Sequence, residues 1–278
     1  MAAAAVVAAA VVSVSNVDNS GGGARSASAG AFVGGDLHSL VVDPARRQRL
    51  FVGGHQSAAT STDGGRTWVQ VASLRDADAM GWAFLGDEVW MGGHPGLRRS
   101  TGDGSFEPAG GELSSIDVHA LGGAGGVLYA ASPGRGVLAS TDEGRTWQVR
   151  SAEAGRRFMG GIVVDPADGE HLLAPDMQAG VVESRDGGRT WRPLGSPGMA
   201  MAVTAVGGDT GHLIVAGGEG AARSTDGGRT WQAIEMPDKA TLIAAADDTT
   251  LYAAALDGDT ARVFRSTDSA GTWRLLNP

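Results

Sequence analysis

The sequence predicts an all-β protein, a six-bladed β-propeller with four-stranded blades, and three observations lead to this prediction. An eight-residue motif of the form STDGGRTW returns along the chain, mostly at intervals near forty residues. Each unit holds four short, β-rich runs that are separated by turn residues. No segment sustains the apolar periodicity of a helix. Four strands per repeat of this length are typical of a propeller blade.

Five octets mark the repeats. They read STDGGRTW at Ser61–Trp68, STDEGRTW at Ser140–Trp147, SRDGGRTW at Ser184–Trp191, STDGGRTW at Ser224–Trp231 and STDSAGTW at Ser266–Trp273. Their aspartates are 79, 44, 40 and 42 residues apart, so the first step spans two repeats. Inside that step, Ser100–Phe106 is a degenerate copy that is one residue shorter and ends in Phe instead of Trp. Six units therefore fill residues 36–278.

The first and last units show the expected strands in order. In the first unit we expect them within LHSLVV (Leu37–Val42), RLFVGG (Arg49–Gly54), SAATS (Ser57–Ser61) and WVQVA (Trp68–Ala72). The sixth unit repeats the pattern with TLIAAA, TLYAAA, ARVFRS and TWRLL. Because the last unit ends with its own fourth strand, we expect the ring to close by packing between blades. Exchange of a strand within Ala31–Gly35 is the alternative.

Each octet is expected to form the turn between the third and fourth strands of its blade. Its glycines suit positive φ angles, its Ser and Asp side chains can accept backbone N–H bonds, and its Trp can pack between blades. Calcium binding is not expected, because calcium takes six to eight oxygen ligands and an octet offers one carboxylate. The residues with this structural role are Asp63, Trp68, Asp142, Trp147, Asp186, Trp191, Asp226, Trp231, Asp268 and Trp273.

Residues 1–30 differ in character from the rest of the chain. The apolar run over residues 2–12 has the length of a signal-peptide core and is too short to span a bilayer, although no Lys or Arg follows Met1. A Gly/Ser-rich stretch over residues 13–29 is typical of a linker. We therefore expect a signal-like segment with a flexible linker at 1–30, the propeller at 31–278, no integral membrane span, and secretion or residence in the cell envelope.

Composition excludes several classes of function. The chain has 278 residues, no cysteine and a formal net charge of -9. The lack of cysteine excludes disulfides, thiolate metal sites, a cysteine nucleophile and the lipid anchor of a bacterial lipoprotein. Since the balance is acidic and no basic stripe carries interleaved aromatic residues, nucleic acid is not expected as a partner. We expect a monomer whose ligand is a carbohydrate or a protein.

The octet S-x-D-x-G-x-T-W resembles the Asp-box, or bacterial neuraminidase repeat. This repeat occurs in sialidases, in xyloglucan-degrading hydrolases, in sortilin-type receptors and in a photosystem II assembly factor. The motifs DLHSLVVDP, VGGH, DAMGW, GGHPG and DVHAL are similar to those of bacterial exported Asp-box proteins that are often described as glycosyl hydrolases. The resemblance implies a sialidase-like propeller over residues 36–278, but no particular reaction, because one fold hosts many activities.

The resemblance also implies where a ligand site lies. In Asp-box propellers the boxes lie on the face opposite the ligand site. The site is therefore expected on the loops that precede each first strand and on those that join second to third strands. Four of the six histidines fall in such loops of the first three blades, whereas His171 and His212 begin second strands and are expected to be structural. The candidate ligand-binding residues of this central funnel are His38, His55, Trp82, His94, His119 and Arg135.

The funnel histidines also suggest a metal site. His94 and His119 are the candidate ligands and copper or zinc the candidate ions; neighbouring thioethers, which suit copper, come from Met80, Met159, Met199 and Met201. The other interpretation is a polar funnel with hydrogen-bonded histidines. The propeller itself is expected to require no cofactor.

A glycoside hydrolase is the alternative function. Two carboxylates must then flank the scissile bond, roughly 5–9.5 Å apart. Asp78 and Asp117 start neighbouring inner strands and are the candidate catalytic pair, with Trp82 as a surface for stacking a sugar. A structural role, in which these aspartates cap loops, is the competing interpretation.

Sialidase chemistry is not expected. The chain has no Arg-Ile-Pro signature, and its two tyrosines, Tyr129 and Tyr252, occupy equivalent second-strand positions typical of packing residues. The sequence therefore favours an exported binding or scaffold module that uses the central funnel, with a glycoside hydrolase second and metal binding third.

Overall fold

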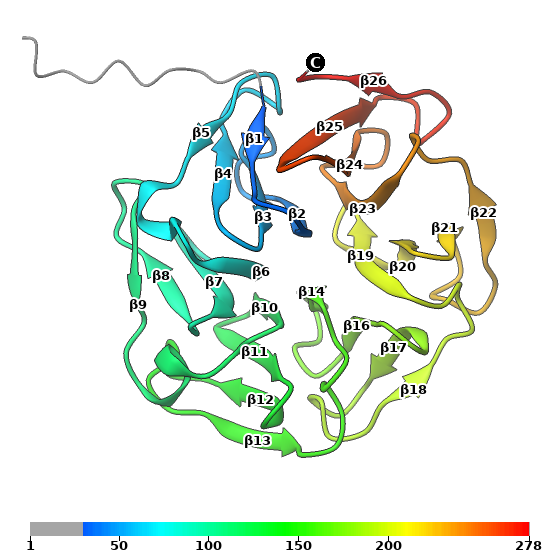
Figure 1. Cartoon of the computed structure of the whole chain (residues 1–278). Coiled ribbons are helices and arrows are strands. Elements are labelled where there is room, and N and C mark those ends of the chain that lie inside the picture. Colours follow the sequence, from blue (N-terminus) through cyan, green and yellow to red (C-terminus); the bar gives the residue numbers. More distant parts are fainter. Residues whose placement is uncertain (1–29, 278) are drawn as a thin grey trace, which may run out of the picture.

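The computed structural model describes residues 30–277, and its architecture confirms the predicted propeller. Six sheets are arranged as blades around a central axis (Figure 1), and their strands pair antiparallel apart from one short parallel pair in the third blade. The segment predicted to be signal-like lies outside the described residues apart from Gly30, so export stays a prediction. Among residues 30–277, no helix is long and apolar enough to cross a membrane.

In each of the first three blades, the four strands lie in chain order from the axis outward. Blade 1 consists of β2 (Leu37–Val42), β3 (Leu50–Gly54), β4 (Ala58–Ser61) and β5 (Val69–Gln70). Blade 2 consists of β6 (Asp78–Leu85), β7 (Glu88–His94), β8 (Arg98–Ser100) and β9 (Phe106–Pro108). Blade 3 consists of β10 (Ala120–Ala124), β11 (Val127–Ser132), β12 (Gly136–Ser140) and β13 (Gln148–Ser151). Two short 3-10 helices, η1 (Ala72–Leu74) and η2 (Glu112–Ser115), precede blades 2 and 3.

The last three blades repeat this order. The short β14 (Gly160–Gly161) joins the sheet of blade 3 beside β10. Blade 4 consists of β15 (Val163–Val164), β16 (Leu172–Asp176), β17 (Gly180–Ser184) and β18 (Arg192–Pro193). Blade 5 consists of β19 (Ala200–Val206), β20 (Asp209–Gly217), β21 (Gly220–Ser224) and β22 (Gln232–Ile234). Blade 6 consists of β23 (Ala240–Ala245), β24 (Leu251–Asp257), β25 (Thr260–Ser266) and β26 (Arg274–Leu275).

The ring closes by the alternative named above, exchange of a strand within Ala31–Gly35, and not by packing between blades alone. The strand β1 (Ala31–Phe32) pairs antiparallel with β25, with Ala31 opposite Ala261. The C-terminal β26 pairs with the other half of the same strand, with Leu275 opposite Phe264. Both ends of the propeller thus share the outer edge of blade 6 (Figure 1).

The octets form the predicted turns between third and fourth strands. In the first, the Ser61 hydroxyl accepts a hydrogen bond from the Gly65 N–H at 2.8 Å and donates to Asp63 at 2.8 Å. The other Asp63 oxygen accepts the Thr67 hydroxyl at 2.7 Å. The Gly64 N–H donates at 2.9 Å to the carbonyl of Gln48, in the turn between the first and second strands. The octets therefore lie on the face where the first strands end, opposite the face where those strands begin.

The octet tryptophans pack between blades, as predicted. Trp68 of blade 1 is 1% exposed and contacts blade 6, and Trp147 of blade 3 is 7% exposed and contacts blade 2. Trp191, Trp231 and Trp273 pack at the three following interfaces but are only partly buried. In the degenerate copy, Phe106 occupies the equivalent place between blades 1 and 2. Each interface between neighbouring blades thus carries its own apolar cluster.

Because the octet carboxylates have lowered pKa values, we expect the protein to lose stability in acid. Hydrogen bonds from the Thr146 hydroxyl and N–H and from the Ser140 hydroxyl lower the pKa of Asp142 to about 2. The equivalent bonds lower the pKa of Asp226 and Asp268 to about 2 as well. An unfolded Asp has a pKa of about 3.9, so below that pH the unfolded state takes up protons before the folded state does. This contribution is complete above about pH 4 and should be lost as the pH falls to about 2.

Chemical unfolding at a series of pH values between these limits checks this prediction. The variant Thr146→Val lacks one donor to Asp142, so its stability should depend less steeply on pH than that of the wild type. A wild-type stability that stays constant over the interval would contradict the prediction.

The centre of the ring is narrow at β14, which lies close to the axis (Figure 1) and pairs in parallel with β10 of blade 3. A Cβ on Gly160 would lie 3.1 Å from the Met201 carbonyl oxygen, 3.8 Å from that of His38 and 4.0 Å from that of Met80. The backbone of β14 therefore lies close to the backbones of blades 1, 2 and 5 at this level. The funnel lies on the side where the first strands begin.

Candidate functional site

The local structure of the funnel depends on β-bulges at the start of the first strands. In blade 1, Leu37 is opposite Gly54 and Ser39 is opposite Gly53, so His38 is the extra residue. In blade 2, Met80 occupies the same place, between Ala79 and Gly81. Bulges bend a strand and redirect a side chain. Here the bulge in blade 1 leaves His38 beside an aspartate of blade 2.

Glycines opposite the bulges explain the VGGH and MGGH motifs. A Cβ on Gly54 would lie 2.1 Å from the Asp36 carbonyl oxygen, and one on Gly93 would lie 1.6 Å from that of Asp78. Only glycine permits so close an approach of the two strands. The next residue in each motif, His55 or His94, then stands at the end of the second strand on the funnel side.

Two histidines of blade 1 converge on one carboxylate of blade 2. The Nε2 atom of His38 lies 3.0 Å from Oδ1 of Asp78, and Nδ1 of His55 lies 3.5 Å from Oδ2. Asp36 is a second carboxylate near His38, at 3.9 Å. His38 is 8% exposed, whereas the side chain of His55 is 64% exposed. We call His38, His55 and Asp78 the blade 1–2 cluster.

His94 of blade 2 and Asp117, which precedes the first strand of blade 3, form a neighbouring pair. Nδ1 of His94 lies 2.5 Å from Oδ1 of Asp117, and both side chains are exposed to solvent. His119 directly precedes β10 on the same face. The charges of four neighbouring residues affect its pKa, namely those of Asp117, Asp78, His38 and His94. The four funnel histidines predicted from the sequence therefore do lie together with Asp78 and Asp117.

The two less exposed histidines differ in their pKa. Burial lowers the pKa of His119, and the nearby carboxylates do not offset this effect, so the ring is neutral at pH 7. Burial also acts to lower the pKa of His38, but contact with Asp78 and the charge of Asp36 outweigh it and raise the pKa above its usual value.

Two of the predicted ligand-binding residues, Trp82 and Arg135, already have partners within the protein. Trp82 is in the middle of β6 and 3% exposed; its ring stacks on Phe51 at 4.6 Å and its N–H donates to the Ser39 hydroxyl at 2.8 Å. It is a core residue between blades 1 and 2, with no ring face free in the funnel. Arg135 follows β11, and its guanidinium is paired with Glu112 at 3.1 Å. The burial of Trp82 removes the stacking surface expected from it, and the role of Arg135 stays a prediction.

The structural roles expected for His171 and for the two tyrosines agree with the geometry, whereas the side chain of His212 is 53% exposed and its expected structural role has no such support. His171 is 6% exposed and lies between Asp165, at 3.1 Å, and Glu183, at 2.9 Å. Tyr129 and Tyr252 are each 2% exposed, as packing residues should be.

A hollow lined by methionines adjoins the funnel on the side of blades 4 to 6. Its volume is about 380 Å³, and Met177, Met199 and Met201 line it together with Asp36 and Lys239. Met177 is 41% and Met199 48% exposed. Sequence reasoning named Met199 and Met201 only as sulfur ligands and missed Met177, although Met177 lies in the same loop position of blade 4 as His55 does in blade 1. By contrast, Met80 and Met159 are 5% and 7% exposed and belong to the core.

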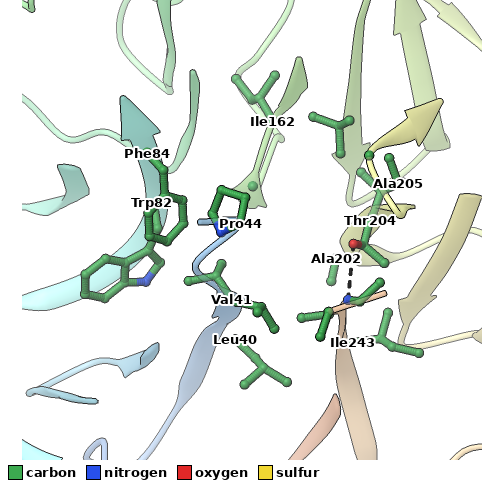
Figure 2. Close-up of a pocket in the computed structure, with 18 of the residues that line it drawn as sticks. Leu40, Val41, Pro44, Trp82, Phe84, Ile162, Ala202, Thr204, Ala205 and Ile243 are labelled. Carbon is green, nitrogen blue, oxygen red and sulfur yellow. Dashed lines mark hydrogen bonds between the residues drawn. The ribbon is translucent and has the colours of Figure 1, made fainter. Parts of the chain in front are cut away.

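A second cavity lies beyond β14, toward the octet face. Its volume is about 320 Å³, and apart from Arg47 and Thr204 its lining side chains are apolar. Figure 2 shows Leu40, Phe84, Ile162 and Ile243 around this space, with the hydrogen bond from the backbone N–H of Ala245 to Thr204 at 3.3 Å. It offers apolar contact and no acid or base for catalysis.

Comparison with known proteins identifies the repeat. Residues 222–233, which contain the fourth octet, match the BNR/Asp-box repeat. No curated protein matches the sequence.

Several solved structures share the fold. The GH74 xyloglucanase from Xanthomonas campestris is 18% identical over 89% of this chain, with a TM-score of 0.60, and this chain spans only 46% of that enzyme. The structure of YCF48 bound to D1 peptide is 18% identical, with a TM-score of 0.54, over 88% of this chain and 82% of that one. A chain of a nidogen/laminin complex is 15% identical, with a TM-score of 0.66, over 83% and 93%. At these identities the similarity concerns the fold alone.

Proposed function

Because the chain is a six-bladed propeller that carries the BNR/Asp-box repeat, we propose that it is a binding module for a protein segment, which it holds on the funnel face. The bound segment places a large apolar side chain in the methionine hollow and a neighbouring Lys or Arg against the aspartates of the funnel. Export from the cell, expected from residues 1–30, is part of the same proposal.

The methionine hollow is the observation that carries the proposal. Among residues 30–277, four large apolar side chains are well exposed, namely Phe32, Val149, Met177 and Met199, and two of these four line this one hollow. Methionine is flexible and polarizable, and it is used at surfaces that adapt to varied apolar partners. Exposed apolar side chains that gather in a hollow mark an interaction site more often than scattered ones do.

The charge of the funnel supports a cationic neighbour in the bound segment. Asp36, Asp78 and Asp117 lie on this face beside the hollow, and the whole chain has a formal net charge of -9. Oppositely charged surfaces speed association and select partners. The peptide bound to YCF48 is a precedent for this use of the fold, though not for this sequence.

Selection of a phage-displayed library of random peptides on the full chain tests the proposal. The selected peptides should carry an apolar residue next to Lys or Arg. They should bind Met177→Ser/Met199→Ser at least about 10-fold more weakly, since the loss of two apolar contacts costs about 1.4 kcal/mol or more. The control is Val149→Ser, which removes a side chain of equal exposure from the outer strand β13 and should bind like the wild type.

Other outcomes of this experiment would contradict the proposal. Selected peptides that bind the double variant as tightly as the wild type would move the site away from the hollow. Failure to select any peptide, together with glycoside turnover that is lost in Asp78→Asn and Asp117→Asn, would favour the glycoside hydrolase instead. Asp78 and Asp117 already contact His38 and His94. These contacts are compatible with carboxylates that hold the histidines in place as well as with catalytic carboxylates.

A further inference from the structure

The blade 1–2 cluster contains a buried histidine that lacks a well-formed hydrogen bond. His38 is 8% exposed, and neither of its ring nitrogens has an aligned hydrogen-bond partner among residues 30–277. Its Nε2 atom is within 3.0 Å of Asp78 Oδ1, but that oxygen too lacks an aligned partner. Buried polar atoms are normally paired, and exceptions often mark an ion or water that completes the site.

The spacing of the three side chains suits a single metal ion. One donor atom from each of His38, His55 and Asp78 lies within 4.8 Å of the other two. Ligands bound to zinc at about 2.0–2.2 Å in a tetrahedron are roughly 3.3–3.6 Å from one another. The separations of 3.0 Å and 3.5 Å between the imidazole nitrogens and the Asp78 oxygens are close to that value. The side chain of His55 is 64% exposed, so its ring has room to turn toward an ion shared with the other two.

We propose that His38, His55 and Asp78 bind one divalent transition-metal ion such as Zn²⁺. Two imidazoles and one carboxylate are a donor set that zinc accepts, and three protein ligands leave a fourth position for water or for a group of a bound partner. Because the side chain of His55 is 64% exposed, that position opens to the funnel. Asp36, 3.9 Å from the same nitrogen of His38, adds a negative charge that favours a cation.

The structure favours this cluster over the pair suggested by the sequence. His94 is already in contact with Asp117 at 2.5 Å. Among the described residues, the blade 1–2 cluster is the one group of three or more His, Asp or Glu side chains whose donor atoms converge closely enough for an ion. The inference goes beyond peptide binding and does not depend on it, since its assays contain no peptide.

Two measurements on the metal-free full chain test the site. Calorimetry measures the binding of ZnCl₂ during a titration, and elemental analysis after dialysis measures the zinc that the protein retains. The wild type should retain one ion per chain. His55→Ala should bind at least about 100-fold more weakly, because loss of a direct ligand should cost at least as much as loss of a supporting residue. His55 is exposed, so this variant should keep the wild-type unfolding midpoint. His212→Ala, which changes another exposed histidine, should bind zinc like the wild type.

Titration with Co²⁺ adds a spectroscopic reading of the same site. A tetrahedral nitrogen and oxygen site should give visible absorption bands in the wild type and in His212→Ala, and these should be lost in His55→Ala and Asp78→Asn. The proposal is overturned if the wild type retains no ion, or if His55→Ala binds zinc as tightly as the wild type. Loss of binding in His94→Ala with full binding in His55→Ala would place the ion at the His94–Asp117 pair instead.

Discussion

Replacement of Trp68 by alanine should lower the free energy of unfolding by about 3–5 kcal/mol, as the truncation of a large buried aromatic residue does. Trp68 is 1% exposed and packs against Tyr252 and Val263 across the interface between blades 1 and 6. Its ring N–H also donates to the Gly65 carbonyl at 3.0 Å. The variant therefore leaves a cavity at the interface where the ring closes.

The matched control is Trp273→Ala, which removes the same residue from the last octet. Trp273 is only partly buried, and its N–H donates to the Glu235 carbonyl of the neighbouring blade at 3.0 Å. Its loss should cost clearly less than that of Trp68. Chemical unfolding at 25 °C measures both. A loss below about 1 kcal/mol for Trp68→Ala, far under the range for buried aromatics, would show that this octet tryptophan does not hold the blades together.

The fold could be predicted because its signals are local and repeated. The Ser, Asp and Gly side chains of each octet satisfy a turn by themselves, as the bonds among Ser61, Asp63, Gly65 and Thr67 show, so a short motif fixes the position of two strands. The first strand of blade 1 was predicted at its observed bounds, Leu37–Val42. The predicted fourth strand, Trp68–Ala72, is shorter in the structure because Trp68 packs inward and η1 begins at Ala72.

The site was predicted only in part, because its geometry depends on contacts between blades. The sequence brought His38, His55, His94 and His119 to one face, since equivalent loops of neighbouring blades must lie together. It did not show that a bulge would place His38 beside Asp78, nor that Trp82 would be in the middle of a strand and face Phe51. The methionine hollow was missed because an exposed Met177 cannot be distinguished from a buried methionine without coordinates.

Ring closure follows the alternative, exchange of a strand within Ala31–Gly35, and not the favoured packing alone. The strand β1 has only two residues, and its pairing is set by Ala261 and Thr260, far along the chain, so the sequence did not decide between the two modes of closure. Asn277 strengthens the other half of this edge, since its side chain accepts the Val263 N–H at 2.7 Å and donates to the Ala261 carbonyl at 2.8 Å. Two short segments from opposite ends of the sequence thus replace one ordinary fourth strand.

A chain that begins at residue 36 should therefore be less stable than one that begins at residue 30, by about 3–6 kcal/mol. The lost segment buries Ala31 and Val33 completely, and its backbone donates two hydrogen bonds to the Asp259 carbonyl, at 2.8 Å from Val33 and 3.0 Å from Gly34. Burial of a Val side chain contributes about 1.5–3 kcal/mol and each hydrogen bond about 1 kcal/mol. Chemical unfolding of the two chains measures the difference.

A pair of point variants separates strand exchange from a general effect of shortening the chain. Val33 is 0% exposed between blades 1 and 6, whereas its neighbour Phe32 is 40% exposed. Val33→Asp places an unpaired carboxylate in that interface and should destabilise the protein about as much as the truncation, while Phe32→Asp should have a much smaller effect. If the truncated chain and Val33→Asp unfold at the wild-type midpoint, packing between blades 1 and 6 is sufficient, and β1 only covers an edge that the ring does not need.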